Sequence, residues 1–325
     1  MAGWLQCGGR RQGRIWRLSD CFTGRPRRTI RRVTIELRAA GSRAVFEPAF
    51  GGRLHQLFVE VEGREVALLH SPEDPAAYGN DPLTGGCYPM APWPNRLRDG
   101  LFMWNGERVA VPNGRKHALH GLVLDRPWEV VARVGRVLEM ACAFGERWPW
   151  EGRAWLRFEL GPDFLAMKME VRAAREAFPA GCGWHPWFRR ALGNTKGGRD
   201  SEVRVRLPAR RRYELEAGLP TGRVMDVAGD LLLDGSPLGD RRLDDCYTEL
   251  GAPIVVEWPG LRLTMTVECA FPHVQVYSPP EAFCIEPQTC APDAFNLPDV
   301  SAGAAVAAPG RPLAIASRWT WEANP

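Results

Sequence analysis

Lysine is nearly absent from this chain of 325 residues, where it occurs only at Lys116, Lys168 and Lys196. Arginine therefore supplies almost all of the positive charge, and with abundant alanine, glycine and proline it indicates a GC-rich genome rather than a chemical role. Long apolar runs are also missing: none approaches the roughly 20 residues that a membrane-spanning helix needs. We therefore expect no membrane partner.

Paired cysteine motifs are missing as well. The nine cysteines include no Cys-x-x-Cys pair, which argues against a zinc ribbon or a thioredoxin-like redox site. Most lie in apolar surroundings, where cysteine acts as a small core residue, and we expect a reducing, cytoplasmic compartment. The sequence also lacks a glycine-rich nucleotide loop and a convincing set of metal ligands. We therefore predict neither a cofactor nor a metal.

The positive charge is concentrated at the N-terminus. Residues 1–32 contain nine arginines and a single acid, Asp20, a net charge of +8, which leaves 33 basic and 37 acidic residues in the rest of the chain. The overall charge of +4 thus gives no reason to expect nucleic-acid binding by the folded part. We interpret residues 1–32 as a disordered basic leader, an over-extended translation start or a targeting segment, and residues 33–325 as the folded domain.

Two-residue alternation of apolar and polar side chains runs through the sequence from about residue 33. It is clearest at 33–37, 154–160, 165–171 and 261–267, and it is typical of half-buried β-strands. Shorter strands are predicted at 43–47, 53–60, 65–70, 128–133, 137–144, 203–207, 254–258, 273–278 and 312–321. Loops are predicted at 191–202, 215–242 and 298–311. No amphipathic helix of ten residues is evident, so we predict an all-β protein, a large antiparallel β-sandwich in a single domain.

One carboxylate, Glu286, stands in a stretch that proline makes rigid. Pro287 fixes its own φ and biases Glu286 toward an extended conformation, and Pro292 stiffens the segment that follows. We expect Glu286 at the end of a strand, held as firmly as a general base requires. Taken alone, the same pattern also fits an ordinary glutamate at an exposed strand end.

A histidine among aromatic residues is the second candidate. His185 lies beside Trp184, Trp187 and Phe188, and histidine is the side chain whose pKa best suits a general acid near neutral pH. Arg96 follows a Pro-Trp-Pro-Asn turn, and its fork of five donors could hold sugar hydroxyls or a carboxylate. A surface salt bridge is the alternative for Arg96.

Two further polar pairs have weaker signals. His117 and His120 have His-x-x-His spacing, but no third ligand supports a metal, and a neutral donor or acceptor role is favoured for His120. Gly121 would permit the backbone to approach a ligand closely. Asp244 and Asp245 are adjacent on a strand, so only one of them can face a shared site, and an exposed turn is the alternative.

Together these residues resemble the aldose 1-epimerase (mutarotase) family, over about residues 35–322. The resemblance rests on the following motifs in this order: Asn-Arg-Leu-x-x-Gly at 95–100, Leu-His-Gly at 119–121, His-Pro-Trp-Phe at 185–188, Asp244 three residues before Tyr247, Glu-Pro-x-Thr at 286–289 and Ala-Pro-Asp-Ala-Phe-Asn at 291–296. Membership would imply a galactose mutarotase-like β-supersandwich, in agreement with the all-β prediction from alternation.

The resemblance also implies roles for individual residues. Glu286 matches the catalytic base of the family and His185 its catalytic acid. The positions that match substrate-binding residues are Arg96, His120, Asp244 and Gln275. Asp244 is preferred to Asp245 because its offset from the following aromatic fits the family. The chain departs from the family at Trp187, where tyrosine is frequent, and at Gln288, where methionine is frequent.

The expected function is therefore interconversion of the α and β anomers of a hexose by acid–base ring opening and closure. Trp104, Trp184 and Trp187 are candidates to stack on the sugar ring. A hexose-6-phosphate 1-epimerase is the nearest alternative, and a carbohydrate-binding or sensor protein without turnover is another. A glycosidase with Asp244 and Glu286 as its carboxylates would leave both histidines unexplained. The sequence gives no indication of the oligomeric state.

Overall fold

The clearest alternation in the sequence forms a long hairpin of β12 (Gly152–Leu160) and β13 (Phe164–Ala173). Leu156 lies opposite Met169, and Phe158 lies opposite Met167. All four side chains are buried, because successive side chains of a strand point to opposite faces and these share the inner one. The strands predicted at 154–160 and 165–171 are confirmed.

The computed structural model describes residues 33–112, 116–192, 203–227, 234–298 and 302–324. The leader predicted at 1–32 and most of the loop predicted at 191–202 lie outside these residues. The described residues belong to one compact unit of the chain. No helix among them has the length and apolar character needed to cross a bilayer.

One large sheet, which we call the outer sheet, contains eight strands in the described chain, in the order β10-β11-β12-β13-β25-β21-β20-β16. Its remaining strands are β10 (Glu129–Val134), β11 (Val137–Ala143), β25 (Leu313–Asn324), β21 (Gly260–Glu268), β20 (Ile254–Trp258) and β16 (Arg204–Arg206). Each neighbouring pair in it is antiparallel.

The second large sheet, the inner sheet, has 11 strands among the described residues, in the order β1-β2-β3-β5-β15-β23-β22-β19-β17-β18, with β4 paired to β3. These strands are β1 (Ile35–Ala39), β2 (Ser42–Glu47), β3 (Arg53–Val61), β4 (Arg64–Ala67), β5 (Cys87–Met90), β15 (Gly183–Arg189), β23 (Ala282–Gln288), β22 (His273–Tyr277), β19 (Asp244–Leu250), β17 (Ala209–Glu216) and β18 (Leu219–Asp226).

Short elements complete the described structure. The two-stranded pairs are β6 (Arg96–Leu97) with β9 (Ala118–Leu119), β7 (Leu101–Trp104) with β8 (Glu107–Ala110), and β14 (Phe178–Ala180) with β24 (Ala305–Ala307). The helices in the described chain are short 3-10 helices of three to five residues, namely η1 (Pro75–Gly79), η2 (Arg98–Gly100), η3 (Gly145–Arg147) and η6 (Ala294–Asn296).

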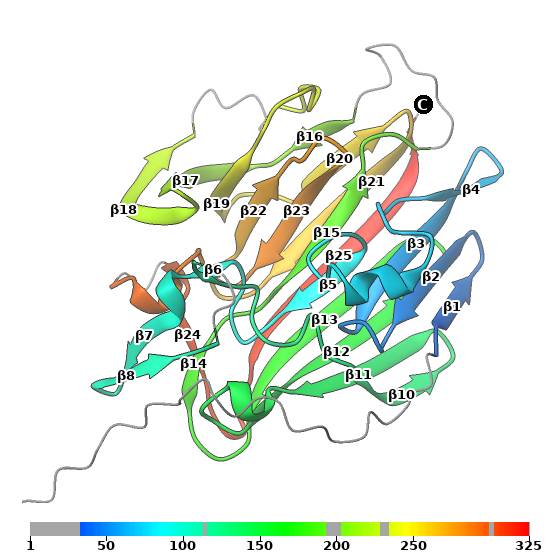
Figure 1. The fold of residues 1–325 in the computed structure, drawn as a ribbon. Coiled ribbons are helices and arrows are strands. Elements are labelled where there is room, and N and C mark those ends of the chain that lie inside the picture. The colour runs from blue at the N-terminus through cyan, green and yellow to red at the C-terminus, as the bar shows by residue number, and fades with distance from the viewer. Residues whose placement is uncertain (1–32, 113–115, 193–202, 228–233, 299–301, 325) are drawn as a thin grey trace, which may run out of the picture. The chain divides into compact units, whose positions relative to one another are not determined.

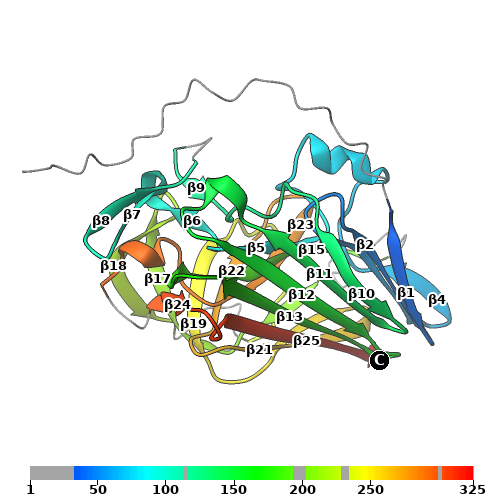
Figure 2. The ribbon, with the colours of Figure 1, turned by 90° about the horizontal axis from the view of Figure 1, so that it is seen from below.

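The two large sheets pack face to face around an aromatic core (Figures 1 and 2). Phe46 of β2 meets Phe158 of β12 with ring centroids 4.7 Å apart, and Phe188 of β15 meets Trp319 of β25 at 5.1 Å. Sandwiches of this kind bury one face of each sheet against the other. The prediction of an all-β antiparallel sandwich is confirmed.

Two of the predicted loops are partly wrong. The segment 215–242 contains β18, and 298–311 contains β24. Strand β18 includes Pro220 and Gly222 and lies at the edge of its sheet, and only its first two residues, Leu219 and Pro220, are buried. An edge strand tolerates proline and has no alternation imposed by burial, so its sequence resembles that of a loop.

Candidate active site

The candidate site lies on the face of the inner sheet that is turned away from the outer sheet. On β15, Trp184 and Phe188 pack into the core between the sheets. His185 and Trp187, which alternate with them, line a cavity on the opposite face. The two-residue period of a strand thus separates the core side chains from the site side chains.

Antiparallel register brings the other site residues beside His185. Tyr88 of β5 lies opposite His185, and Glu286 of β23 lies opposite Gln275 of β22. Asp244, the first residue of β19, is the next pocket residue across the sheet, opposite Tyr277. Strands far apart in the sequence therefore place these groups on one surface.

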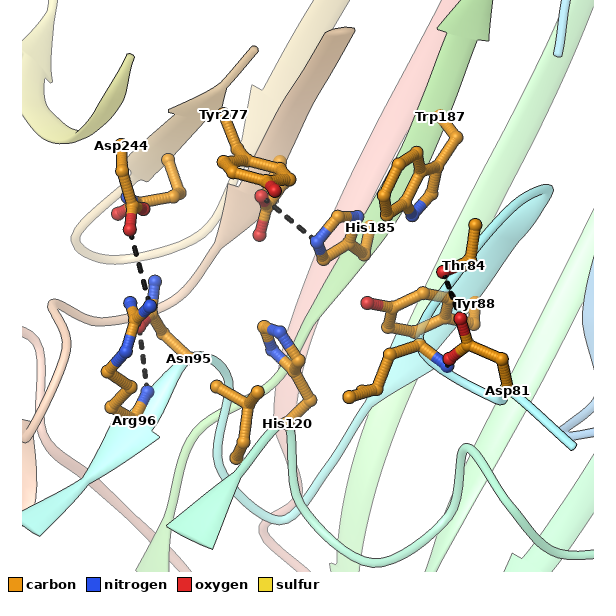
Figure 3. Close-up of a pocket in the computed structure, with 14 residues that line it drawn as sticks. Asp81, Thr84, Tyr88, Asn95, Arg96, His120, His185, Trp187, Asp244 and Tyr277 are labelled. Carbon is orange, nitrogen blue, oxygen red and sulfur yellow. Dashed lines mark hydrogen bonds and ion pairs between the residues drawn. The ribbon is translucent and has the colours of Figure 1, made fainter. Parts of the chain in front are cut away.

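These residues enclose a cavity of about 320 Å³ that is partly open to solvent. Ligand pockets span roughly 300–1,000 Å³, so this volume suits a small molecule. Its lining, drawn in Figure 3, consists of Asp81, Leu83, Thr84, Tyr88, Asn95, Arg96, Leu119, His120, His185, Trp187, Asp244, Gln275, Tyr277 and Glu286. All six residues predicted as catalytic or substrate-binding are among them.

His185 and Glu286 form a direct contact at the centre of the cavity. His185 Nε2 lies 3.2 Å from Glu286 Oε1, and both residues are almost fully buried, at 4% and 1% exposure. Tyr88 stacks on the imidazole with centroids 4.7 Å apart, and Trp187 stacks on it at 5.5 Å. Aromatic neighbours thus hold the imidazole plane toward the carboxyl group.

Burial controls the protonation of this pair. It lowers the pKa of His185 well below its usual value, an effect that nearby His120 reinforces. Burial also raises the pKa of Glu286 well above its usual value, and the negative charge of Asp244 adds to this. Both shifts favour an uncharged pair that holds one proton between Nε2 and Oε1. The alternative charge state, ionised Glu286 beside protonated His185, differs only in the position of this shared proton, so the total number of protons is the same.

Glu286 retains hydrogen-bonding capacity toward a ligand. Within the described chain, its second oxygen, Oε2, is buried and has no hydrogen-bond partner. The side-chain oxygen Oε1 of Gln275, on the adjacent strand, is in the same condition. Buried polar atoms normally have partners, so these two acceptors mark where the hydroxyl groups of a ligand would bind.

An ion pair closes one end of the cavity. Arg96 Nη2 lies 3.2 Å from Asp244 Oδ2, and Gln275 Nε2 donates to Asp244 Oδ1 at 2.6 Å. The guanidinium packs against Gly218 in the turn between β17 and β18, where a Cβ atom would come within 2.5 Å of Arg96 Cζ. Glycine at that position therefore lets the turn support Arg96 from behind.

Asn95 and His120 hold strained backbone conformations beside the pair. Their φ angles are 54° and 58°, in the left-handed region that costs roughly 1–3 kcal/mol for most residues. The backbone N–H of His120 donates to the carbonyl of Asn95 at 2.8 Å. The imidazole of His120 consequently meets that of His185 edge-on, with centroids 5.1 Å apart.

One expectation about backbone geometry is wrong, and for a second the structure gives a different reason. Glu286 does not end a strand, because β23 continues through Pro287 to Gln288. Proline is tolerated there because the described pairing of β23 with β15 is interrupted between Gly183–Gln288 and Trp187–Cys284. Gly121 is needed for close approach to the backbone of Ala91 rather than to a ligand, since a Cβ would lie 2.1 Å from the Ala91 carbonyl oxygen.

The remaining candidates divide between the cavity and other places. Of the proposed stacking tryptophans, only Trp187 lines the cavity, whereas Trp184 is in the core and Trp104 packs against Trp150. Asp245 forms an ion pair with Arg212 at 3.0 Å, away from the cavity lining. Adjacent strand residues face opposite sides, which explains the difference between Asp244 and Asp245.

Several lining residues were not predicted from the sequence. Tyr277 could have been found, since it follows Gln275 by two residues and therefore shares its face of β22. Tyr88 shows no such signal, because Cys87–Met90 is too short and too apolar to reveal which side chain faces a site. Asp81 and Thr84 lie in an irregular segment after η1, where no periodicity applies.

One group of side chains has the composition of a metal site. Donor atoms of His185, Cys284 and Glu286 all lie within 4.8 Å of one another. Burial raises the pKa of Cys284 well above its usual value, and the charge of Glu286 adds to this. Cys284 does not line the cavity, and Glu286 already contacts His185 directly, so we do not assign this group to a metal. His117, which forms the His-x-x-His spacing with His120, contacts Asp99 and does not line the cavity.

Comparison with known proteins identifies relatives of this chain. A family model described as aldose 1-epimerase matches residues 33–307. The Escherichia coli protein YihR, described as uncharacterized, is 22% identical over 253 residues, which cover 72% of this chain and 78% of YihR.

Solved structures with a similar fold include a galactose mutarotase-like protein of Clostridium acetobutylicum. It aligns with a TM-score of 0.78 and 19% identity, over 90% of this chain and 95% of that one. An aldose epimerase homologue of C. elegans aligns with a TM-score of 0.73 and 19% identity, over 90% and 100% of the two chains. At such low identity these structures show the shared fold alone.

Proposed function

Because this chain belongs to the aldose 1-epimerase family, we propose that it is a mutarotase that interconverts the α and β anomers of a hexose. The contact of 3.2 Å between His185 Nε2 and Glu286 Oε1 carries the proposal. It sets an acid and a base side by side in a small cavity lined with polar groups. Anomer exchange needs one proton removed and one delivered, which such a pair supplies.

The reaction begins with Glu286 as the base. Its carboxylate takes the proton from the hydroxyl group on C1, while His185 donates a proton to the ring oxygen. The bond between C1 and the ring oxygen breaks as the C1 carbonyl forms. Rotation about the C1–C2 bond exposes the other face of the aldehyde, and the ring closes as both proton transfers reverse. The site ends with the proton count with which it began.

The other lining residues hold the sugar during this exchange. Arg96 and Asp244 offer a donor and an acceptor at one end of the cavity, 3.2 Å apart. Gln275 offers its unpartnered oxygen, and His120 lies edge-on to the catalytic imidazole. The ring of Trp187 supplies an apolar surface against which a sugar ring can pack.

The charges of the cavity support a neutral hexose over a hexose 6-phosphate. Among the described lining residues, Arg96 is the only arginine or lysine, and it is already paired with Asp244. Asp81 and Glu286 contribute further carboxyl groups. A phosphate group is normally held by unengaged cationic side chains.

We propose a cytoplasmic location because the described cysteines are all free thiols.

Polarimetry on freshly dissolved α-D-glucose and α-D-galactose tests the proposal. The wild-type protein should accelerate mutarotation of at least one of them. Glu286→Gln should reduce the enzymatic rate by about 10³-fold or more, because the amide has the shape of the carboxyl group but does not accept a proton. Glu281→Gln is the matched control, since Glu281 is exposed in the turn before the same strand.

The alternatives give different outcomes in polarimetry, in calorimetry and with a glycoside as substrate. Acceleration with glucose 6-phosphate but with neither free sugar would favour the phosphosugar epimerase. Binding of a sugar in calorimetry without any acceleration would favour a sensor protein. Release of a sugar from a glycoside would indicate a glycosidase. Each of these results would contradict the mutarotase proposal.

A further inference from the structure

Arg53, the first residue of β3, is a buried cation that the proposed reaction does not use. Its side chain is 0% exposed, and burial lowers its pKa. Among the described residues, no carboxylate forms a salt bridge with it. A buried charge without an opposite charge is costly unless polar groups take the place of water. The groups that do so here indicate what Arg53 holds.

Backbone carbonyl groups surround the guanidinium. Its Nη1 donates to the carbonyl oxygens of Thr84 at 3.2 Å and Gly85 at 2.8 Å, and its Nη2 donates to that of Pro82 at 2.7 Å. Its Nε donates to the carbonyl of Phe50 at 3.0 Å. The planar fork of arginine can bind several acceptors at once in a fixed geometry. One side chain therefore fixes the path of residues 82–85.

Two tyrosine rings complete the environment of Arg53. Its Cζ lies 3.9 Å from the ring centroid of Tyr78 and 5.1 Å from that of Tyr88. Such contacts attract a cation to the face of the ring. Tyr88 in turn stacks on His185 with centroids 4.7 Å apart. Arg53 is thus one side chain away from the catalytic imidazole.

The residues that Arg53 holds form a wall of the cavity. Asp81, Leu83 and Thr84 all line it, and we call residues 81–85 the wall segment. The hydroxyl of Thr84 donates to Asp81 Oδ2 at 2.6 Å. This hydrogen bond holds the two polar groups side by side in the cavity lining. Figure 3 shows Asp81 and Thr84 across the cavity from Asp244 and Arg96, with His120 and His185 between them.

We propose that Arg53 is a positioning residue that holds the wall segment, so that Asp81 and Thr84 contact the end of the sugar opposite Arg96 and Asp244. This inference rests on the proposed function, since it takes the ligand to be a sugar. It assigns to Arg53 an effect on substrate affinity, with no proton transfer of its own.

Steady-state kinetics of Arg53→Lys test the proposal. Lysine keeps the charge but loses the fork, so the wall segment should loosen while the catalytic pair remains. We expect KM to rise about 10-fold with kcat changed by less than about 3-fold, the pattern of lost binding contacts. Arg126→Lys is the matched control, because Arg126 also donates to backbone carbonyls, those of Ala143 and Phe144, outside the cavity lining. It should leave KM unchanged.

A double-mutant cycle separates positioning from a general loss of stability. Thr84→Val should raise KM about 5-fold in the wild-type background but less than about 2-fold together with Arg53→Lys, because a displaced wall has no contact left to lose. Equal effects in both backgrounds, or an unchanged KM for folded Arg53→Lys, would overturn the proposal. If Arg53→Lys does not fold, Arg53→Gln, which keeps an N–H donor, replaces it in the same cycle.

Binding measurements distinguish failure of this inference from failure of the proposed function. Calorimetric titration with D-galactose and D-glucose gives a Kd that does not depend on turnover. If the wild type binds sugar but shows no mutarotation, the mutarotase proposal fails. In that case, a Kd that Arg53→Lys raises about 10-fold still supports the role of Arg53 in positioning the wall segment. If the wild type is active and Arg53→Lys binds sugar equally well, the positioning proposal fails alone. A wild type that neither binds nor turns over sugar contradicts both.

Discussion

The outer sheet and the centre of the inner sheet solve different physical problems. Strand β12 of the outer sheet alternates between buried and half-exposed residues, with one face on the core and one toward solvent. Strands β5 and β23 of the inner sheet are buried along their whole length. One of their faces is the core and the other is the floor of the cavity. The outer sheet can therefore be optimised for packing alone, whereas the inner sheet must also carry polar chemistry.

The difference shows where the molecule accepts unfavourable local structure. The cavity side of the inner sheet holds a buried carboxyl group in Glu286, a buried imidazole in His185 and a buried guanidinium in Arg53. Left-handed φ angles occur nearby at Asn95 and His120. Each of these features costs stability in isolation. The apolar packing between the sheets must offset that cost, so changes in the two regions should have separable effects on stability and activity.

Replacement of the catalytic imidazole should produce the largest effect on activity. His185→Asn removes the group that protonates the ring oxygen, so kcat for mutarotation should fall about 10²–10⁴-fold, the usual contribution of general acid–base catalysis. Thermal unfolding should change little, because His185 lines the partly open cavity, so the smaller asparagine leaves no closed void in the core. Polarimetry and calorimetry on the same preparation measure both quantities.

A buried histidine outside the cavity provides the control for this variant. His273 of β22 is 0% exposed, bonds to Tyr213 at 3.2 Å and does not line the cavity. His273→Asn should lower the melting temperature yet leave kcat per folded molecule within about 2-fold of wild type. If both histidine variants lost activity equally, His185 would have no special catalytic role.

A core substitution in the outer sheet should produce the opposite result. Phe158 is 1% exposed and packs on Phe46 across the sandwich. Phe158→Ala should destabilise the protein by about 3–5 kcal/mol through the cavity that it leaves. The kcat and KM of the molecules that remain folded should be unchanged at low temperature. Urea unfolding and polarimetry at 15 °C would check this, and a changed KM would mean that the two sheets are coupled.

The ion pair at the end of the cavity should influence affinity with little effect on stability. Asp244 is 41% exposed in its side chain and accepts hydrogen bonds from both Arg96 and Gln275. Asp244→Asn should raise KM about 10-fold. The neutral amide accepts hydrogen bonds more weakly than the carboxylate, which should reduce the binding free energy of the sugar by about 1–2 kcal/mol. The melting temperature should move by less than about 2 °C. Asp245→Asn, on the opposite face, is the control and should leave KM unaltered.

The same comparison explains what could be predicted from the sequence. Outer-sheet strands such as β12, β13 and β21 were predicted, because one wet face imposes alternation. The site strands β5 and β15 were not, because burial on both faces removes alternation, and Pro89 and Pro186 imitate loops. The resemblance to the family nevertheless indicated all six predicted catalytic and substrate-binding residues, and all six line the cavity. Arg53 and the wall segment could not be predicted, since their contacts are made with backbone carbonyls, which any sequence provides.

The smallest expected effect concerns pH and stability. Burial raises the pKa of Glu286 well above its usual value, so the native state holds a proton that the unfolded chain releases above about pH 4.3. Stability from this group is therefore complete below that pH and is lost progressively as the pH rises toward the native pKa. Glu286→Gln keeps the shape of the protonated group without this loss. The variant should melt a few degrees above wild type at pH 8 and close to it at pH 4.5, as calorimetry at both pH values would reveal. A constant difference between the two pH values would mean that the native state does not retain this proton, and it would contradict the raised pKa of Glu286.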